Sequence, residues 1–163
     1  MGLRIRAATL DDAAAICAIY NQGIEDRIAT LETALRTPDE RRAWLARREA
    51  RHPVIVAEED GRVVSWGSLN PFMTRPGYRF VADFSIYVER ERRGKGIGRQ
   101  LLARLEELAR ELGYHKLLLT ALPWNAAGLA LYEAFGFRTV GVYKEQGQID
   151  GRWVDTVVME KLL

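Results

Sequence analysis

The sequence predicts an α/β protein with a mixed, mostly antiparallel twisted sheet flanked by helices. Its 163 residues are 48% hydrophobic and 28% charged, which suits one globular domain with a substantial core. Strand-like runs follow one another as hairpins in the first half, whereas a strand–helix–strand segment in the second half favours a parallel pair. No linker or repeat interrupts the chain, so we expect residues 1–163 to form a single domain.

From the N-terminus, residues 3–8 (LRIRAA) form a short strand-like run, and two helical segments follow it. The first, AAAICAIYNQGI, comes after a capping box, T-L-D-D, that begins at Thr9. Its Cys17 lies among apolar neighbours and is expected to fill the core. The second begins at Pro38, a residue type favoured at the first helical position, and should reach about Arg51.

Three strands are expected in the middle of the chain. VIVAEE (54–59) and RVVSWGSL (62–69) flank Asp60-Gly61, a dipeptide favoured in two-residue hairpin turns. These two strands should therefore pair antiparallel. A longer run, YRFVADFSIYVE, follows at residues 78–89.

The second half alternates helices and strands. Apolar residues recur on one face of a helix over residues 97–112, and Gly113 closes it. HKLLLTAL (115–122) predicts a fully buried strand. Asn125 begins a further helix that ends at Gly136, and FRTVGVYKEQ and RWVDTVVMEKLL then form a terminal hairpin.

Composition argues against several functional classes. The net charge of +2 is low for a nucleic-acid-binding protein, and no basic stripe is interleaved with aromatic residues. No apolar run approaches the roughly 20 residues that cross a bilayer, and no signal-peptide core precedes the first acidic pair. The single cysteine excludes an internal disulfide, and no ligand spacing suggests a metal. We therefore expect a cytoplasmic protein without metal, nucleic-acid or membrane partners.

The strongest functional signal is R-G-K-G-I-G, residues 93–98, which joins a strand to a helix. A helix N-terminus presents unpaired N–H groups and partial positive charge to an anion, and glycines allow a close approach. Arginine and lysine side chains add formal charge here. The segment therefore predicts a phosphate-binding turn, with a solvated charged loop as the alternative.

Two common nucleotide-binding patterns do not fit this turn. A Walker A loop requires serine or threonine after its lysine, but Gly96 follows Lys95. The dinucleotide fingerprint G-x-G-x-x-G does not match G-K-G-I-G.

The pattern that fits is [QR]-x-x-G-x-[GA], which resembles the acyl-CoA pyrophosphate loop of the GNAT superfamily of N-acetyltransferases. The order of elements is similar over essentially the whole chain. The resemblance implies acetyl-CoA as the acetyl donor and a splayed strand beside it. It implies that the cofactor-binding residues are Ile86, Tyr87, Val88, Arg93, Gly94, Lys95, Gly96, Ile97, Gly98, Arg99 and Asn125.

Three separated segments resemble phosphinothricin acetyltransferases and their relatives that acetylate methionine sulfoximine and sulfone. IYNQGIEDRIATLET is similar to their first helix and substrate loop, which implies substrate contacts at Thr30 and Leu31. RPGYRFVADFSIYV places Arg75, Tyr78 and Asp83 at the spacing of an arginine, a tyrosine and an acidic residue of that group. The closing G-x-W-x-D element is matched by Gly151, Trp153 and Asp155.

The resemblance implies direct attack of an α-amine on the acetyl thioester. Asp83, where relatives carry glutamate, is the implied base, and Tyr132, where close relatives often carry histidine, is the implied acid for the departing thiolate. Arg75, helped by Tyr78, is the implied ligand of the substrate's anionic end. Ile149 stands where some relatives have lysine.

Other interpretations stay open at this point. Asn125 is a good helix cap in any case, Tyr132 fits a core position, Asp83 fits a structural polar group, and Arg75 fits a solvated loop. The alternative functions are acetylation of protein N-termini or lysines, and a non-catalytic CoA-binding module. Relatives of this kind are often dimers, so a homodimer through the C-terminal hairpin is expected.

Overall fold

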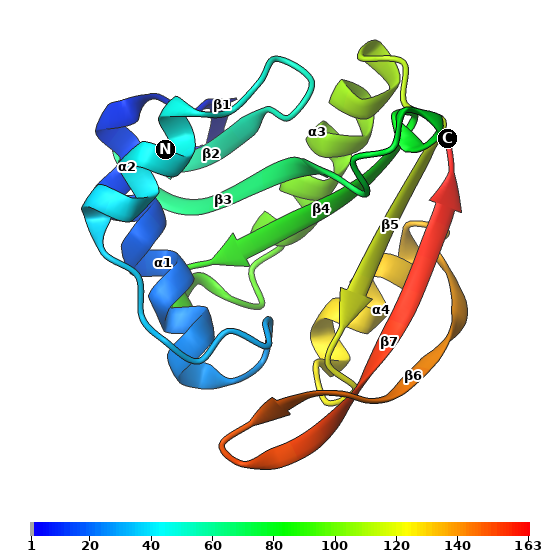
Figure 1. Cartoon of the computed structure of the whole chain (residues 1–163). Helices are drawn as coiled ribbons and strands as arrows, with labels where there is room; N and C mark the ends of the chain where they lie inside the picture. Colours follow the sequence, from blue (N-terminus) through cyan, green and yellow to red (C-terminus); the bar gives the residue numbers. More distant parts are fainter. Residues whose placement is uncertain (1) are drawn as a thin grey trace.

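The computed structural model describes residues 2–163 and contains one seven-stranded sheet in the order β1-β2-β3-β4-β5-β7-β6 (Figure 1). All neighbouring strands are antiparallel except β4 and β5, which are parallel. The predicted mixed, mostly antiparallel α/β sheet is therefore confirmed. The strands are β1 (Arg4–Ala7), β2 (Val54–Glu59), β3 (Arg62–Pro71), β4 (Val81–Val88), β5 (Lys116–Ala121), β6 (Arg138–Ile149) and β7 (Arg152–Leu162). The α-helices are α1 (Ala13–Asp26), α2 (Pro38–Ala46), α3 (Ile97–Glu111) and α4 (Ala126–Ala134).

Helices cover both faces of the sheet, because each face carries an apolar surface. On one face, α1 and α2 pack over Val54, Val56 and Trp66. On the other, α3 buries its leucines against β3, β4 and β5, and α4 packs beside it (Figure 1). The strand side chains alternate between the two cores, as the two-residue period of a strand requires.

The local signals that set these elements are visible in the backbone. Asp60 and Gly61 both have positive φ, 52° and 76°, as the tight hairpin turn between β2 and β3 requires. The Asp12 carboxylate accepts from the Thr9 backbone N–H at 2.7 Å and so caps the entry to α1. Gly113, with φ of 83°, closes α3. No helix within residues 2–163 is long and apolar enough to cross a membrane.

Three predicted elements differ from the structure. The helix α2 ends at Ala46 and not near Arg51, because Arg48 turns onto the sheet and donates to the carbonyl oxygens of His52 and Leu69. The strand β4 begins at Val81, after a short 3₁₀ turn.

The strand β5 was expected to be fully buried, and this prediction is wrong. Its Leu117 and Leu119 are buried, but Thr120 is exposed. The reason is that β5 parts from β4 halfway along, so one face of its second half borders a cavity.

Candidate active site

The site lies where the two parallel strands separate. β4 and β5 pair only from Val81 to Asp83, opposite Lys116 to Leu118, and they diverge beyond this point (Figure 1). Past Asp83, the edge of β4 that faces β5 carries backbone N–H and C=O groups without a strand partner. The expected splayed strand is therefore present, and Asp83 sits at its fork.

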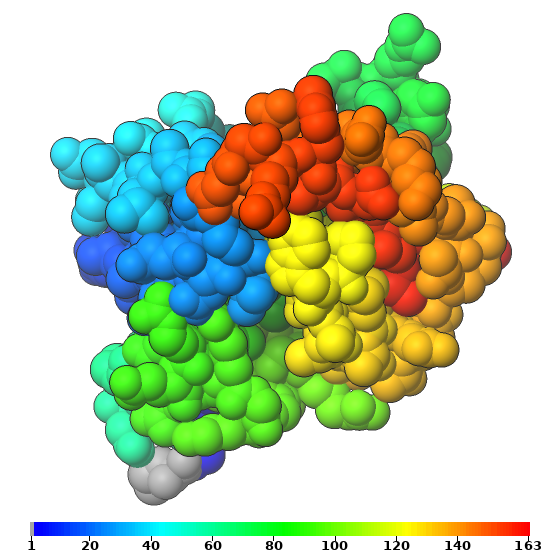
Figure 2. Space-filling model, turned by 90° about the horizontal axis from the view of Figure 1, so that it is seen from below, coloured from blue at the N-terminus to red at the C-terminus, as the bar shows by residue number. Residues whose placement is uncertain are grey.

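Two joined cavities occupy the fork. One, of about 410 Å³, lies over the glycine turn and is called here the loop cavity. The other, of about 190 Å³, contains Asp83 and is called the Asp83 cavity. Their shared lining residues are Ala29, Ile86, Tyr87, Asn125 and Tyr132. Seen from the open end of the fork, the α1 end (blue), the basic turn (green) and the start of α4 (yellow) converge (Figure 2).

The glycine turn has the geometry of an anion cradle. Gly94 and Gly96 have φ of 77° and 82°, a conformation that glycine adopts without the strain that other residues meet. Gly96 is the N-cap of α3 and has no capping side chain, so the first N–H groups of the helix remain available to a ligand. The predicted phosphate-binding role of Gly94, Gly96, Ile97 and Gly98 fits this arrangement, since all four line the loop cavity.

The cations around this turn are not equivalent. The Arg93 guanidinium binds the Asp26 carboxylate at 2.6 Å and so fastens the turn to α1. Arg92, also expected to add positive charge to this turn, lines the cavity but pairs with Glu59 at 3.0 Å. Arg99 lines the cavity and has no carboxylate partner within residues 2–163. Lys95 is exposed and is not among the lining residues, so Arg99 is the cation best placed for a phosphate.

The opposite wall of the cavity is the start of α4. The Asn125 side chain accepts from the Gly128 backbone N–H at 3.1 Å, so it caps the helix and also lines both cavities. A Cβ at position 128 would lie 2.5 Å from the Asn125 amide nitrogen, so any larger residue there would displace the capping side chain. The cap and the binding-site interpretations of Asn125 are therefore compatible.

Asp83 is the only charged residue that lines its cavity in the described part of the chain. Burial raises its pKa from 3.8 to about 6, and a hydrogen bond from Asn70 opposes this shift. Burial, together with the charge of Asp83, raises the pKa of Tyr132 to about 12. The two side chains thus lie close enough to influence each other, with Asp83 suited to accept a proton and Tyr132 protonated at neutral pH.

The loop after α1 brings one of its two predicted residues into the site. Thr30 lines the Asp83 cavity together with Tyr87. Leu31 does not line either cavity, because it packs against a small core at the base of the terminal hairpin. The loop is fixed by a hydrogen bond from the Trp124 indole N–H to the Arg27 carbonyl at 2.7 Å.

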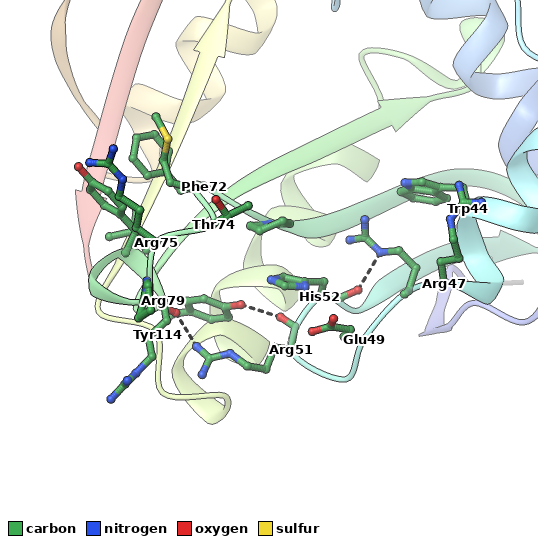
Figure 3. Close-up of a pocket in the computed structure, with 16 residues that line it drawn as sticks. Trp44, Arg47, Glu49, Arg51, His52, Phe72, Thr74, Arg75, Arg79 and Tyr114 are labelled. Atoms are coloured by element: carbon green, nitrogen blue, oxygen red, sulfur yellow. Dashed lines mark hydrogen bonds between the residues drawn. The ribbon is translucent and has the colours of Figure 1, made fainter.

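Arg75 and Tyr78 lie in a different cavity, which shares no lining residue with that of Asp83. This cavity, the arginine pocket, has a volume of about 600 Å³ and lies beside the end of α2 and the β3–β4 connection (Figure 3). Its arginines are Arg47, Arg48, Arg51, Arg75 and Arg79, and none has a carboxylate oxygen within 4.0 Å in residues 2–163. Arg75 and Tyr78, which the sequence spacing grouped with Asp83, therefore do not share a cavity with it in this chain.

Several lining residues were missed by sequence analysis. Gly23 is the most informative, because a Cβ there would lie 3.2 Å from the Tyr87 ring. A glycine in the interior of a predicted helix was the available signal, since it often marks a close approach. The other missed residues are Ile28, Ala29, Ala127, Gly128 and Leu131.

Comparisons with known proteins agree with this geometry. Residues 17–137 match the family model described as "Acetyltransferase (GNAT) family". The L-methionine sulfoximine/L-methionine sulfone acetyltransferase of Salmonella typhimurium is 35% identical over 97% of this chain and 93% of its own.

Solved structures are similar over nearly the full length. The ribosomal-protein-alanine N-acetyltransferase from Brucella melitensis has a TM-score of 0.94 and 42% identity, covering 98% of this chain and 99% of its own. The phosphinothricin acetyltransferase from Sinorhizobium meliloti in complex with AcCoA has a TM-score of 0.93 and 31% identity, covering 100% and 89%.

Proposed function

Because the chain belongs to the GNAT family of acetyltransferases, we propose that it acetylates the α-amino group of a small amino-acid-like substrate. The acetyl donor is acetyl-CoA, which a structural neighbour binds. The proposed acceptors are phosphinothricin, methionine sulfoximine, methionine sulfone or a similar compound. The Asp83 cavity, of about 190 Å³ with a single carboxylate, carries this proposal, because it suits a small amine.

In the proposed mechanism the amine attacks the thioester carbonyl directly. An α-amino group has a pKa near 8 and is mostly protonated at neutral pH, so it must first lose a proton. Asp83, with a pKa of about 6, accepts it. The N–C bond then forms and the C–S bond breaks. Tyr132 donates a proton to the departing thiolate, and the surplus proton of the new amide nitrogen returns to the Tyr132 oxygen. Backbone N–H groups near Ile86, Tyr87 and Val88 polarise the carbonyl oxygen.

The function is tested by following thiol release from acetyl-CoA over a panel of amines. The panel comprises phosphinothricin, methionine sulfoximine, methionine sulfone, the common amino acids and a peptide with a free N-terminus. Turnover of one or more small amino acids supports the proposal, whereas turnover of the peptide alone contradicts it.

The substrate's anionic end needs a cation that the Asp83 cavity lacks. We propose Arg75 with Tyr78 for this role, which requires the anionic end to extend out of the Asp83 cavity, because both residues line the separate arginine pocket. Replacement of Arg75 by glutamine should raise KM for the amino acid about 10- to 100-fold, the loss expected for a hydrogen bond between charged groups. KM for acetyl-CoA should not change. Initial-rate kinetics with Arg42→Gln as a control will test this, because Arg42 is an exposed arginine on α2 outside the lining of the three cavities. An unchanged KM for the amino acid would remove Arg75 from the substrate site.

Tyr132 is proposed to act as the acid. Its replacement by phenylalanine keeps the ring packed against Phe84, 5.6 Å between centroids, and removes only the hydroxyl. We expect kcat to fall about 10- to 100-fold without loss of folding. Comparing kcat and the melting temperature of the two proteins separates a chemical role from a packing role.

A homodimer through the terminal hairpin is also proposed. The hairpin β6–β7 exposes several large apolar side chains, and the Trp153 side chain is 61% exposed. Such clusters commonly mark interaction surfaces. Trp153→Glu should convert a dimer into a monomer in light scattering, while Leu35→Glu, which changes a similarly exposed residue in the loop before α2, should not. A wild-type monomer would contradict the proposal.

Acetylation of a protein N-terminus is the second candidate function. It is favoured by the similarity to a protein described as a ribosomal-protein-alanine N-acetyltransferase. It requires an open groove for a polypeptide, whereas the Asp83 cavity is small. The peptide in the amine panel distinguishes the two. A protein that binds acetyl-CoA but releases no thiol with any amine would instead be a CoA-binding module.

A further inference from the structure

A chain of hydrogen bonds leads from Arg48 and Ser68 to Asn70, the neighbour of Asp83 on the adjacent strand. Asn70 of β3 is the direct antiparallel partner of Asp83 on β4, and Ser68 is the partner of Ser85. Directly opposed residues of an antiparallel pair project from the same face of the sheet. The Asn70 amide therefore lies beside the Asp83 carboxylate, and as a neighbouring donor it lowers the carboxylate's pKa.

The orientation of the Asn70 amide is fixed by Arg48, a donor that cannot act as an acceptor. Its Oδ1 atom accepts from the Arg48 Nη2 atom at 3.0 Å and from the Ser68 Oγ atom at 2.9 Å. A guanidinium has no acceptor, so the oxygen must face Arg48. The Nδ2 group is then directed the other way, donating to the Ser85 Oγ atom at 3.1 Å with its second hydrogen left for Asp83.

Arg48 is itself held in place. Its Nε atom donates to the His52 carbonyl at 2.9 Å and its Nη2 atom donates to the Leu69 carbonyl at 2.6 Å. The guanidinium lies 4.5 Å from the centroid of the Trp44 ring. It lines the arginine pocket and has no carboxylate partner within residues 2–163, so its positive charge acts on Asn70 without being neutralised nearby.

We propose that Asn70, oriented by Arg48 and Ser68, is a positioning residue that aims the Asp83 carboxylate into the cavity and stabilises its ionised form. This inference rests on the proposed function, in which ionised Asp83 is the base. Without the Arg48 guanidinium, the Asn70 amide is free to turn its oxygen toward Asp83 and repel it. Burial alone raises the pKa of Asp83, and the amide keeps that rise moderate, so that the carboxylate is charged at neutral pH.

Few other groups compete for control of Asp83. The titratable side chains that share its cavity are Tyr132 from α4 and Tyr87 from β4, and burial raises the pKa of both phenols. Both are therefore neutral when Asp83 titrates. The loop after α1 and the strand β5 contribute only Thr30 and Thr120 as polar side chains. Ser85 and Asn125 also line this cavity, but Asn70 is the neighbour that lowers the pKa of Asp83.

The test is the titration of the Asp83 carboxyl followed by ¹³C NMR, assigned by comparison with Asp83→Asn. Asn70→Ala should raise the pKa of Asp83 by about one unit or more, because a hydrogen bond to a charged group is lost. Asn70→Asp should raise it further, since a second carboxylate then faces the first. Arg48→Gln should raise it by a smaller amount, and Arg42→Gln, which changes an exposed arginine, should leave it unchanged.

The kinetic profiles separate this role from a structural one. In Asn70→Ala the midpoint of kcat/KM against pH should move upward with the NMR value. A rise of one unit from about 6 makes kcat/KM about threefold lower at pH 6.5, about tenfold lower at pH 5, and equal to the wild-type value near pH 9. An unchanged pKa of Asp83 in Asn70→Ala and Arg48→Gln overturns the proposal. If the NMR value moves but Asp83→Asn retains turnover, the positioning stands and the assignment of Asp83 as base fails. Should Asn70→Ala not fold, the pKa of Asp83 in Arg48→Gln tests the same proposal, with a smaller upward shift expected.

Discussion

Replacement of Asp83 by asparagine is expected to lower kcat by about 10²- to 10⁴-fold, the range associated with a lost general base. Asparagine keeps the shape of the side chain and the Asn70 neighbour but cannot accept a proton. In the wild-type protein kcat/KM should rise with pH and level off above a midpoint near 6, because burial raises the pKa of Asp83 to about 6 and only the ionised form acts. Initial rates from pH 5 to 9 measure both effects.

Stability provides the control for that variant. The folded-state pKa of Asp83 lies above the ordinary value of 3.8, so the folded protein binds more protons than the unfolded chain between the two values. Folding stability contributed by this group is therefore lost as pH rises through about 6. Asparagine avoids the cost, so Asp83→Asn should be more stable at pH 8, by about 2–3 kcal/mol at most, and no more stable at pH 4. If Asp83→Asn had both a lower activity and a lower melting temperature, the loss of activity would reflect misfolding and not a lost base.

Asp83→Glu offers a matched comparison, because glutamate has the same charge and one more methylene group. Appreciable turnover by this variant is expected, since the base is kept. An inactive glutamate variant would show that the reach of the carboxylate, and not its presence alone, is decisive.

The double replacement of Gly94 and Gly96 by alanine is expected to raise KM for acetyl-CoA about 30- to 100-fold. Both glycines have positive φ, and a Cβ in that conformation destabilises the backbone by about 1–2 kcal/mol per residue. The turn should relax to another shape and withdraw its N–H groups from the phosphate. Initial-rate kinetics and calorimetric titration with CoA both report this loss.

Gly141→Ala is the control for this pair. Gly141 lies in β6, has no positive φ, and a Cβ there would meet nothing within 4 Å. KM for acetyl-CoA should stay within twofold of the wild-type value. Unaltered acetyl-CoA binding by the Gly94/Gly96 variant would contradict the assignment of the turn as the phosphate cradle.

The parts of the site that could be predicted are those built from adjacent residues. The glycine turn over residues 93–98 combines its positive-φ glycines and the N-terminus of α3 within one short segment, so sequence alone defines its shape. The exceptions within it are Arg93 and Lys95, whose side chains depend on their surroundings. Asp26, distant in sequence, binds Arg93, and no sequence motif predicts that contact.

The substrate side could be predicted only in part, because its residues come from separate segments. The resemblance grouped Arg75, Tyr78 and Asp83 by spacing, but a turn at Pro76–Tyr78 and the start of β4 place the first two in another cavity. Leu31 was expected beside the substrate and packs instead under the terminal hairpin. Asn70 was not found at all, since the predicted strand stopped one residue before it.

The sequence by itself determined the class of fold, the hairpin at Asp60-Gly61, the donor loop and the presence of an acidic residue on β4. These depend on local backbone preferences and on the periodicity of apolar residues, and both are set by residues that are close in the sequence. Only the tertiary structure decided how Asp83 is tuned. Its cavity is closed by Tyr132 from α4 and Thr120 from β5, and its amide partner, Asn70, is oriented by Arg48 from beyond α2. A pKa depends on burial and on neighbours in space, and neither is fixed until the strands have paired.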